Sequence, residues 1–197
     1  MVIAYEVGKS VYFNITNLCP CNCKFCLRNN GPGINPNESL WLEHEPTVDE
    51  VISVLENLDY PKYKEAVFCG YGEPTERLDI LLKTAEFIKS LTIKPPIRLN
   101  TNGLSDLINN TKTAPKLAGL IDRVSISLNA PNAKMYNSMC LPMFGEKSFD
   151  SLIQFAKDCK QCIPEVKMTV VGSTLSAADI SQCAELCNSL DISLRVR

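Results

Sequence analysis

Two kinds of segment alternate along this chain, and the alternation constrains the fold more than any other feature. Short apolar runs rich in β-branched residues are separated, in most cases, by stretches whose apolar residues recur at helical spacing. Alternating strands and helices build a parallel sheet whose helices lie outside it. The runs expected to form strands are 10–16, 65–70, 96–101, 122–129, 165–172 and 191–197.

The helix-period stretches carry their own boundary signals. In 47–58 the apolar residues fall on one face, and Thr47 with Glu50 predicts a capping box at the start of the helix. Later stretches repeat this periodicity. We expect helices at 47–58, 76–91, 147–159 and 176–190, and a shorter one near 114–120.

Six strands leave the chain short of a closed barrel. A complete (β/α)8 barrel needs roughly 250 residues, and this chain has 197. We therefore expect an α/β fold, an open partial (β/α)6 barrel of TIM type, formed by residues 1–197 as one domain. A doubly wound sheet is the alternative. Both place ligands at the carboxyl ends of the strands, so residues with chemical roles should follow the strand runs.

Composition narrows the function classes. The formal net charge is −2 and no block of Lys and Arg stands out, so there is no direct signal of nucleic-acid binding. No apolar run approaches the roughly 20 residues that span a bilayer, and the first residues lack the layout of a signal peptide. We expect a cytoplasmic protein whose ten cysteines are reduced thiols rather than disulfides.

Four of those cysteines crowd into the loop after the first expected strand. Cys19, Cys23 and Cys26 have the spacing C-x3-C-x2-C, and three thiolates from one loop can hold three irons of a 4Fe–4S cluster. Leaving the fourth iron open is typical of a catalytic rather than a structural site. We expect Cys21, which lies between two of the ligands, to point away from the metal. A zinc knuckle or uninvolved thiols are the alternatives.

The second strand run ends in an irregular turn, "VFCGYGEPTE" at 67–76. Its glycines and proline expose backbone carbonyls beside one carboxylate, Glu73. An ammonium group has three donors and no acceptor, so such a turn suits one. A plain strand-to-helix turn is the alternative interpretation. The residues of this candidate site are Gly70, Tyr71, Gly72, Glu73 and Pro74.

Polar side chains also end the next two strand runs. Asn100 and Asn102 close one of these runs. Ser127 and Asn129 close the other, where the alternation of side chains along a strand places them on the same face. Polar groups that face a core need hydrogen-bond partners, which a ribose or a carboxylate would supply. Ordinary turn chemistry is the alternative, because Asn-Gly is a common turn pair. Arg195, on the last run, either reaches a carboxylate or is a solvated charge at the sheet edge, and we favour the second.

These motifs, taken in order, resemble those of the radical SAM superfamily. C-x3-C-x-Φ-C, with an aromatic residue at Phe25, is the defining motif of that family. The resemblance implies that Cys19, Cys23 and Cys26 bind the 4Fe–4S cluster, and that its open iron chelates the amino and carboxylate groups of S-adenosylmethionine. It also implies that Phe25 lies on the adenine side.

The resemblance extends to the later strand ends. It implies that the turn at 70–74 binds the methionine amino group, although the family has G-G-E-P and Tyr71 replaces the first glycine here. Gly70 is expected to compensate. The implied ribose and carboxylate contacts are Asn100, Asn102, Ser127 and Asn129, and Gly172 would let the backbone approach adenine.

Narrower motifs resemble one group within the superfamily. C-x3-C-x-F-C-x-R-N, W-L-E-x-E-P-T and F-C-G-Y-G-E-P-T are similar to the short radical SAM proteins associated with TatD-type hydrolases. The resemblance implies an enzyme that cleaves S-adenosylmethionine reductively to a 5′-deoxyadenosyl radical, which abstracts hydrogen from a substrate that the sequence does not identify. It implies a flavodoxin or ferredoxin as reductant and a TatD-type hydrolase as functional partner.

Other functions fit the same residues. A glycyl-radical activase and an enzyme of the carboxy-deazaguanine synthase type share the superfamily chemistry. A non-catalytic iron–sulfur or zinc module for electron transfer belongs to another class, but a carrier would supply four cluster cysteines.

The remaining cysteines are interpreted as core residues, because buried thiols commonly act as small apolar side chains. An auxiliary cluster is the alternative for the four cysteines of the last two expected helices. The residues are Cys69, Cys140, Cys159, Cys162, Cys183 and Cys187.

Overall fold

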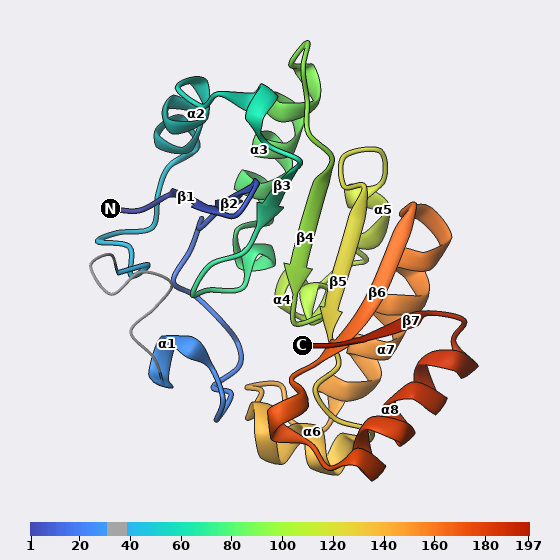
Figure 1. Ribbon diagram of the computed structural model, residues 1–197. Helices are drawn as coiled ribbons and strands as arrows, with labels where there is room; N and C mark the ends of the chain where they lie inside the picture. The colour runs from blue at the N-terminus through green and yellow to red at the C-terminus, as the bar shows by residue number, and fades with distance from the viewer. Residues whose placement is uncertain (31–38) are drawn as a thin grey trace.

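The structure, a computed structural model, describes residues 1–30 and 39–197. Its described residues form one seven-stranded sheet in which the strands follow their order in the sequence (Figure 1). β1 (Ala4–Val7) pairs antiparallel with β2, and every later pair is parallel. The other strands are β2 (Ser10–Phe13), β3 (Glu65–Phe68), β4 (Ile97–Thr101), β5 (Arg123–Ser127), β6 (Glu165–Val170) and β7 (Ser193–Val196).

The strand order confirms the open partial barrel. β2 to β7 are the six predicted parallel strands, and their sequential order excludes a doubly wound sheet, in which the order reverses at a switch point. β1 was not predicted. It forms a hairpin with β2 around Gly8, whose φ of 61° lies in the left-handed region that glycine favours.

Helices connect the parallel strands. The predicted capping box is present at Thr47 and Glu50, and the helix expected at 76 begins later because Pro74–Arg77 forms a 3-10 turn. α4 and α6 are short and were not predicted. The helices are α1 (Leu27–Asn30), α2 (Val48–Glu56), α3 (Leu78–Ser90), α4 (Ser105–Asn109), α5 (Ala114–Leu117), α6 (Ala133–Cys140), α7 (Lys147–Cys162) and α8 (Ala177–Ser189), with 3-10 turns η1 (Tyr60–Lys62), η2 (Pro74–Arg77) and η3 (Gly172–Thr174).

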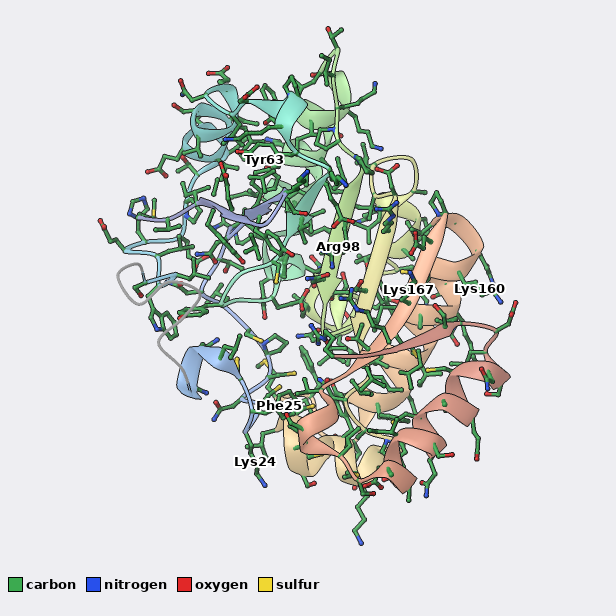
Figure 2. The ribbon with its side chains drawn as sticks, in the orientation of Figure 1. Lys24, Phe25, Tyr63, Arg98, Lys160 and Lys167 are labelled. Carbon is green, nitrogen blue, oxygen red and sulfur yellow. The ribbon has the colours of Figure 1, made fainter. Side chains whose placement is uncertain are left out.

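The two faces of the sheet differ in chemistry. Successive side chains of a strand point to opposite faces. One face is apolar and buried, with Phe68, Leu99 and Ile126 completely covered, and Figure 1 shows α5 and α7 behind it. The opposite, concave face is polar and carries Arg98 and Lys167 (Figure 2). The helices therefore bury one face of the sheet and leave the concave face available for ligands.

The cysteines of α7 and α8 lie where core packing predicts. Cys159, Cys183 and Cys187 are fully buried, and Cys162 packs against the same core. No disulfide joins any of the described cysteines. Cys187 Sγ lies 3.6 Å from Met168 Sδ on β6, so these thiols fill space between helices and sheet.

None of the helices in the described part of the chain is long and apolar enough to cross a membrane.

Candidate functional site

The cysteine loop follows β2 and is held in place by the end of α6 and the residues directly after it. Asn22 N donates to Cys140 O at 3.1 Å, Lys24 N donates to Met139 O at 3.0 Å, and Met143 N donates to Pro20 O at 2.8 Å. These backbone hydrogen bonds fasten a loop of little regular structure to the last turn of α6 and the residues after it, far along the sequence. In Figure 2 sulfur atoms gather beside Phe25, in this loop.

The thiols of Cys21 and Cys140 shift the pKa values of two predicted cluster ligands. A hydrogen bond with Cys140 lowers the pKa of Cys23 to about 4, and a hydrogen bond with Cys21 lowers the pKa of Cys19. The same hydrogen bonds raise the pKa of Cys140 and of Cys21. Hydrogen bonds to a charged group favour its charged form. These contacts therefore favour the thiolate forms of Cys19 and Cys23, and the thiolate is the form that binds metals. Burial raises the pKa of Cys26.

The expected orientation of Cys21 was therefore wrong. Its thiol, which is 8% exposed, does not turn away from its neighbours but lies between Cys19 and Cys23. The backbone of Cys21 pairs with Pro142 in an isolated antiparallel bridge.

The donor set fits an iron–sulfur cluster better than a single ion. A zinc site needs four ligands within about 2.3 Å of one ion. Among the residues that the structure describes, no three His, Cys, Asp or Glu side chains converge in that way. Cluster thiolates bind different irons and need not meet at one point. Three cysteines on one loop, two of them favoured as thiolates, have the required chemistry.

The turn after β3 packs directly on the start of the cysteine loop. A Cβ at Gly72 would lie 2.3 Å from Thr16 O and 2.6 Å from Leu18 O, and Glu73 N donates to Leu18 O at 2.7 Å. Neither Gly70, Tyr71 nor Gly72 has a positive φ. Tyr71 is thus accommodated without strain, and Gly72 is required for close approach.

The Glu73 carboxylate does not face a ligand. It is 4% exposed, and its Oε1 accepts hydrogen bonds from Thr75 N, Thr75 Oγ1 and Thr101 Oγ1 at 3.1, 2.8 and 2.8 Å. Its Oε2 accepts from Asn102 N at 2.6 Å. Burial raises the pKa of Glu73. The side chain, expected to present a carboxylate to an ammonium group, instead ties the end of β3 to the end of β4.

The polar residues at the next strand ends divide into two groups. Asn100 Oδ1 accepts from Arg98 Nη1 at 3.0 Å, on the concave face. Asn102 Nδ2 lies 3.9 Å from Cys21 Sγ, and Asn129 Nδ2 lies 3.8 Å from Cys140 Sγ. Asn129 has a φ of 58°, so it leaves the alternation of β5, and its Oδ1 is buried without a hydrogen-bond partner in the structure. Asn102 and Asn129 therefore support the thiol group.

A cavity of about 430 Å³ adjoins the cysteine loop at the carboxyl ends of the strands. The structure brings five of the predicted residues to its wall: Phe25, Cys26, Gly70, Tyr71 and Ser127. It does not bring the other predicted cofactor residues to the wall: Gly72, Glu73, Pro74, Asn100, Asn102, Asn129 and Gly172. A Cβ at Gly172 would meet Val196 Cγ1 at 2.8 Å, so that glycine allows close approach to β7 rather than to this cavity.

Sequence reasoning did not place Tyr5, Leu40, Cys69 or Arg197 in the cavity wall, nor Cys140 against Cys23. Val171, which neighbours the predicted Gly172, also lines the cavity. The position of Cys69 directly after β3 was the one available signal. A larger hollow of about 580 Å³ lies at the opposite end of the sheet, beside Ile163 and Ser193. It adjoins the amino ends of β6 and β7, where α/β folds do not place their active sites.

Arg28 and Tyr71 line the cavity, and both contact Trp41. Arg28 Cζ lies 4.8 Å from the centre of the Trp41 ring, and the Trp41 and Tyr71 rings meet edge to face at 5.4 Å. The loop that carries Trp41 is fastened to the chain after β2, because Asn17 Nδ2 donates to Leu42 O at 2.8 Å.

Comparisons with known proteins agree with this geometry. The family model described as the radical SAM superfamily matches residues 13–187. No curated protein gives a significant match. The structure of a radical SAM methyltransferase from Sphaerobacter thermophilus superposes with a TM-score of 0.65 at 17% identity, over 98% of this chain and 57% of that one.

Two further solved structures share the fold. Methylornithine synthase (PylB) gives a TM-score of 0.64 at 13% identity, over 95% of this chain and 52% of its own. The structure of native anSMEcpe with bound AdoMet gives a TM-score of 0.58 at 17% identity, over 94% of this chain and 50% of that one. The chain thus spans about half the length of the solved structures that it matches.

Proposed function

Because the chain belongs to the radical SAM superfamily, whose members use a 4Fe–4S cluster and S-adenosylmethionine, we propose that it is an enzyme of this chemistry. Cys19, Cys23 and Cys26 would hold the cluster, and the adjoining cavity would hold S-adenosylmethionine. The observation that carries the proposal is the position of Cys26. It belongs to the cysteine triad and also lines the cavity at the strand ends.

When bound, these two cofactors supply a carbon-centred radical that abstracts hydrogen from a substrate. The residues of the chain bind and orient the reactants. Phe25 offers a ring face to the adenine, and the Ser127 hydroxyl offers a hydrogen bond to a ribose oxygen. Leu40 and Val171 are apolar parts of the wall that exclude water from a reactive site.

The remaining predicted residues surround the side chains that would contact the cofactor. Gly70 and Tyr71 would contact the cofactor, whereas Gly72, Glu73 and Pro74 shape the turn. Asn100 would act from the concave face. Asn102 would orient the Cys21 thiol of the cysteine loop, and Asn129 would orient the Cys140 thiol of α6. Gly172 would position Val171 in the wall.

The test is reductive cleavage of S-adenosylmethionine. Protein reconstituted anaerobically with iron and sulfide is mixed with dithionite, and methionine and 5′-deoxyadenosine are measured by liquid chromatography. We expect both products from the wild type and from Cys162→Ala, whose side chain lies outside the site, and neither from Cys26→Ala. A wild-type cluster that leaves S-adenosylmethionine intact would overturn the proposal.

The assignment of this chain to one group within the superfamily rests on sequence motifs. We propose that the chain belongs with the short TatD-associated members, that a flavodoxin or ferredoxin reduces it, and that a TatD-type hydrolase is its functional partner. C-x3-C-x-F-C-x-R-N and F-C-G-Y-G-E-P-T support the assignment. Replacing dithionite by a reduced flavodoxin tests the reductant, and calorimetric titration with a TatD-type hydrolase tests the partner.

A further inference from the structure

The concave face of the sheet carries charged side chains that the proposed function does not use. Arg98 on β4, Arg123 on β5, Lys167 on β6 and Arg195 on β7 line one hollow of about 330 Å³. Arg98 and Lys167 stand on this face in Figure 2. Arg195, interpreted from the sequence as a solvated charge at the sheet edge, is exposed on the edge strand β7 and also lines this hollow.

The acidic residues of this hollow neutralise only part of its positive charge. Glu65 pairs with Arg98 and Arg123 at 2.9 and 3.0 Å. Glu165 pairs with Arg123 and Lys167 at 2.9 and 2.6 Å.

Two cations of this surface have no carboxylate partner among the described residues. Arg195 lines the hollow, and Arg197 lines the cofactor cavity. Neither forms an ion pair with any residue in the described part of the chain. The face therefore carries five cations against two carboxylates, and the excess is unpaired.

The unpaired charge lies toward the cofactor cavity. Glu65 and Glu165 are the first residues of their strands, at the amino end of the sheet. Further along, the register places Thr169 opposite Arg195, and Arg197 follows at the cavity. Glu73 also lies at the carboxyl end, but its oxygens accept four hydrogen bonds from the protein. No other side-chain carboxylate lines the cavity among the described residues.

The hollow and the cavity adjoin along β5. Ser125 lines the first and Ser127 lines the second, and the two side chains share one face of the strand. A molecule bound in the hollow would therefore lie next to the cofactor. A concave surface of one charge sign concentrates ligands of the opposite sign.

We propose, on the basis of the proposed function, that the substrate is a small molecule with a carboxylate or phosphate group, and that Lys167 and Arg195 bind this anion. Guanidinium and ammonium groups form charge-assisted hydrogen bonds with both kinds of oxyanion. Arg197 lines the adjoining cavity, so a second cationic side chain faces the space beside the anion. A volume of about 330 Å³ is within the range of small-molecule pockets.

The test measures anion binding by holoprotein saturated with S-adenosylmethionine. Inorganic phosphate and succinate are titrated separately by anaerobic calorimetry at low ionic strength, and binding of either one supports the proposal and identifies the oxyanion. We expect Arg195→Gln and Lys167→Gln to weaken binding about tenfold, and Lys167→Arg to retain it. Lys83→Gln, which removes an exposed charge on α3, is the matched control and should bind like the wild type.

Three results would overturn the inference: neither anion binds, the Gln variants bind like Lys83→Gln, or the anion binds only to wild-type holoprotein that lacks S-adenosylmethionine. The last result would assign these cations to the cofactor itself. Cleavage of S-adenosylmethionine is measured on the same wild-type preparation. Anion binding without cleavage would reject the proposed function alone, and cleavage without anion binding would reject the anion site alone.

Discussion

At the scale of single residues, hydrogen bonds between thiols decide which cysteines are ready to bind metal. The spacing of Cys19, Cys23 and Cys26 predicts a cluster loop, but spacing does not determine ionisation. Cys140, at the end of α6, and Cys21 stabilise the thiolates of Cys23 and Cys19. The low pKa of Cys23 is therefore a property of the folded chain.

Removing the Cys140 thiol tests whether it lowers the pKa of Cys23. In Cys140→Ala we expect the pKa of Cys23 to rise from about 4 toward the ordinary thiol value of about 8.5, because the hydrogen bond that favours its thiolate is lost. The pH dependence of Cys23 alkylation by iodoacetamide in the cluster-free protein, followed by mass spectrometry of the peptide, measures the change. Cys162→Ala is the control, and an unchanged titration in Cys140→Ala would contradict the prediction.

At the scale of elements, the turn between β3 and α3 is shaped by contact with its neighbours. Gly72 packs against the backbone of 16–18, and Glu73 joins this turn to the turn after β4. Three strand ends are thus coupled around the cysteine loop. A defect in one turn should consequently disturb cluster binding as well as stability.

Gly72→Ala tests this coupling. The new Cβ would lie 2.3 Å from Thr16 O, a backbone atom that cannot move alone. We expect the free energy of unfolding in urea to fall by about 2 kcal/mol and the iron content after reconstitution to fall with it. In the control Gly172→Ala the Cβ meets the Val196 side chain, which can rotate, so normal iron content is expected. Full iron content in Gly72→Ala would show that the turn and the loop are independent.

The capping box of α2 provides a pH-dependent test at the same scale. A hydrogen bond from the Thr47 backbone, followed by contacts with His44 and the Thr47 side chain, lowers the pKa of Glu50 from 4.5 to about 2. A lowered folded-state pKa stabilises the fold above the unfolded pKa, and this contribution is lost as the pH falls from about 4.5 to about 2. Glu50→Gln should unfold at lower urea concentration than the wild type at pH 7, with a difference that shrinks in that window.

Glu56→Gln, on the exposed side of the same helix, is the matched control. Its urea midpoint should follow the wild type at every pH. A constant difference between Glu50→Gln and the wild type from pH 7 to pH 3 would contradict the assigned role of Glu50.

At the scale of the whole molecule, the fold separates its cysteines into two environments. Those of α7 and α8 fill the layer between helices and sheet, whereas Cys19, Cys21, Cys23, Cys26 and Cys140 gather at the opening of the barrel. This separation argues for one cluster per chain and against an auxiliary cluster.

Iron analysis tests the separation. We expect about four irons and four sulfides per reconstituted chain. The Cys183→Ala and Cys187→Ala variants should retain this content while losing about 1 kcal/mol of stability each, because a buried sulfur is removed from the core. Cys23→Ala should lose the cluster. A content near eight irons in the wild type, falling to four in the α8 variants, would establish an auxiliary cluster instead.

The sequence predicted the order and kind of most large elements and the residues of the cysteine triad. Hydrophobic periodicity, caps and motif spacing are local properties, so they can be interpreted without knowing which segments meet. The strands β2 to β7, the helices α2, α3, α7 and α8, and the capping box at Thr47 follow from such signals. β1 was not predicted because Ala4–Val7 includes Glu6 and is partly exposed, so it lacks the buried apolar pattern of the other strands.

Tertiary structure alone decided which side chains meet. It placed Cys140 against Cys23, turned the Glu73 carboxylate toward Thr101 and Asn102, and brought Arg195 onto the concave face. Each of these contacts joins segments separated by tens of residues, and their distances depend on how strands and helices pack together. Residue types and spacing therefore determined what chemistry the chain can support, while packing determined which groups are close enough to perform it.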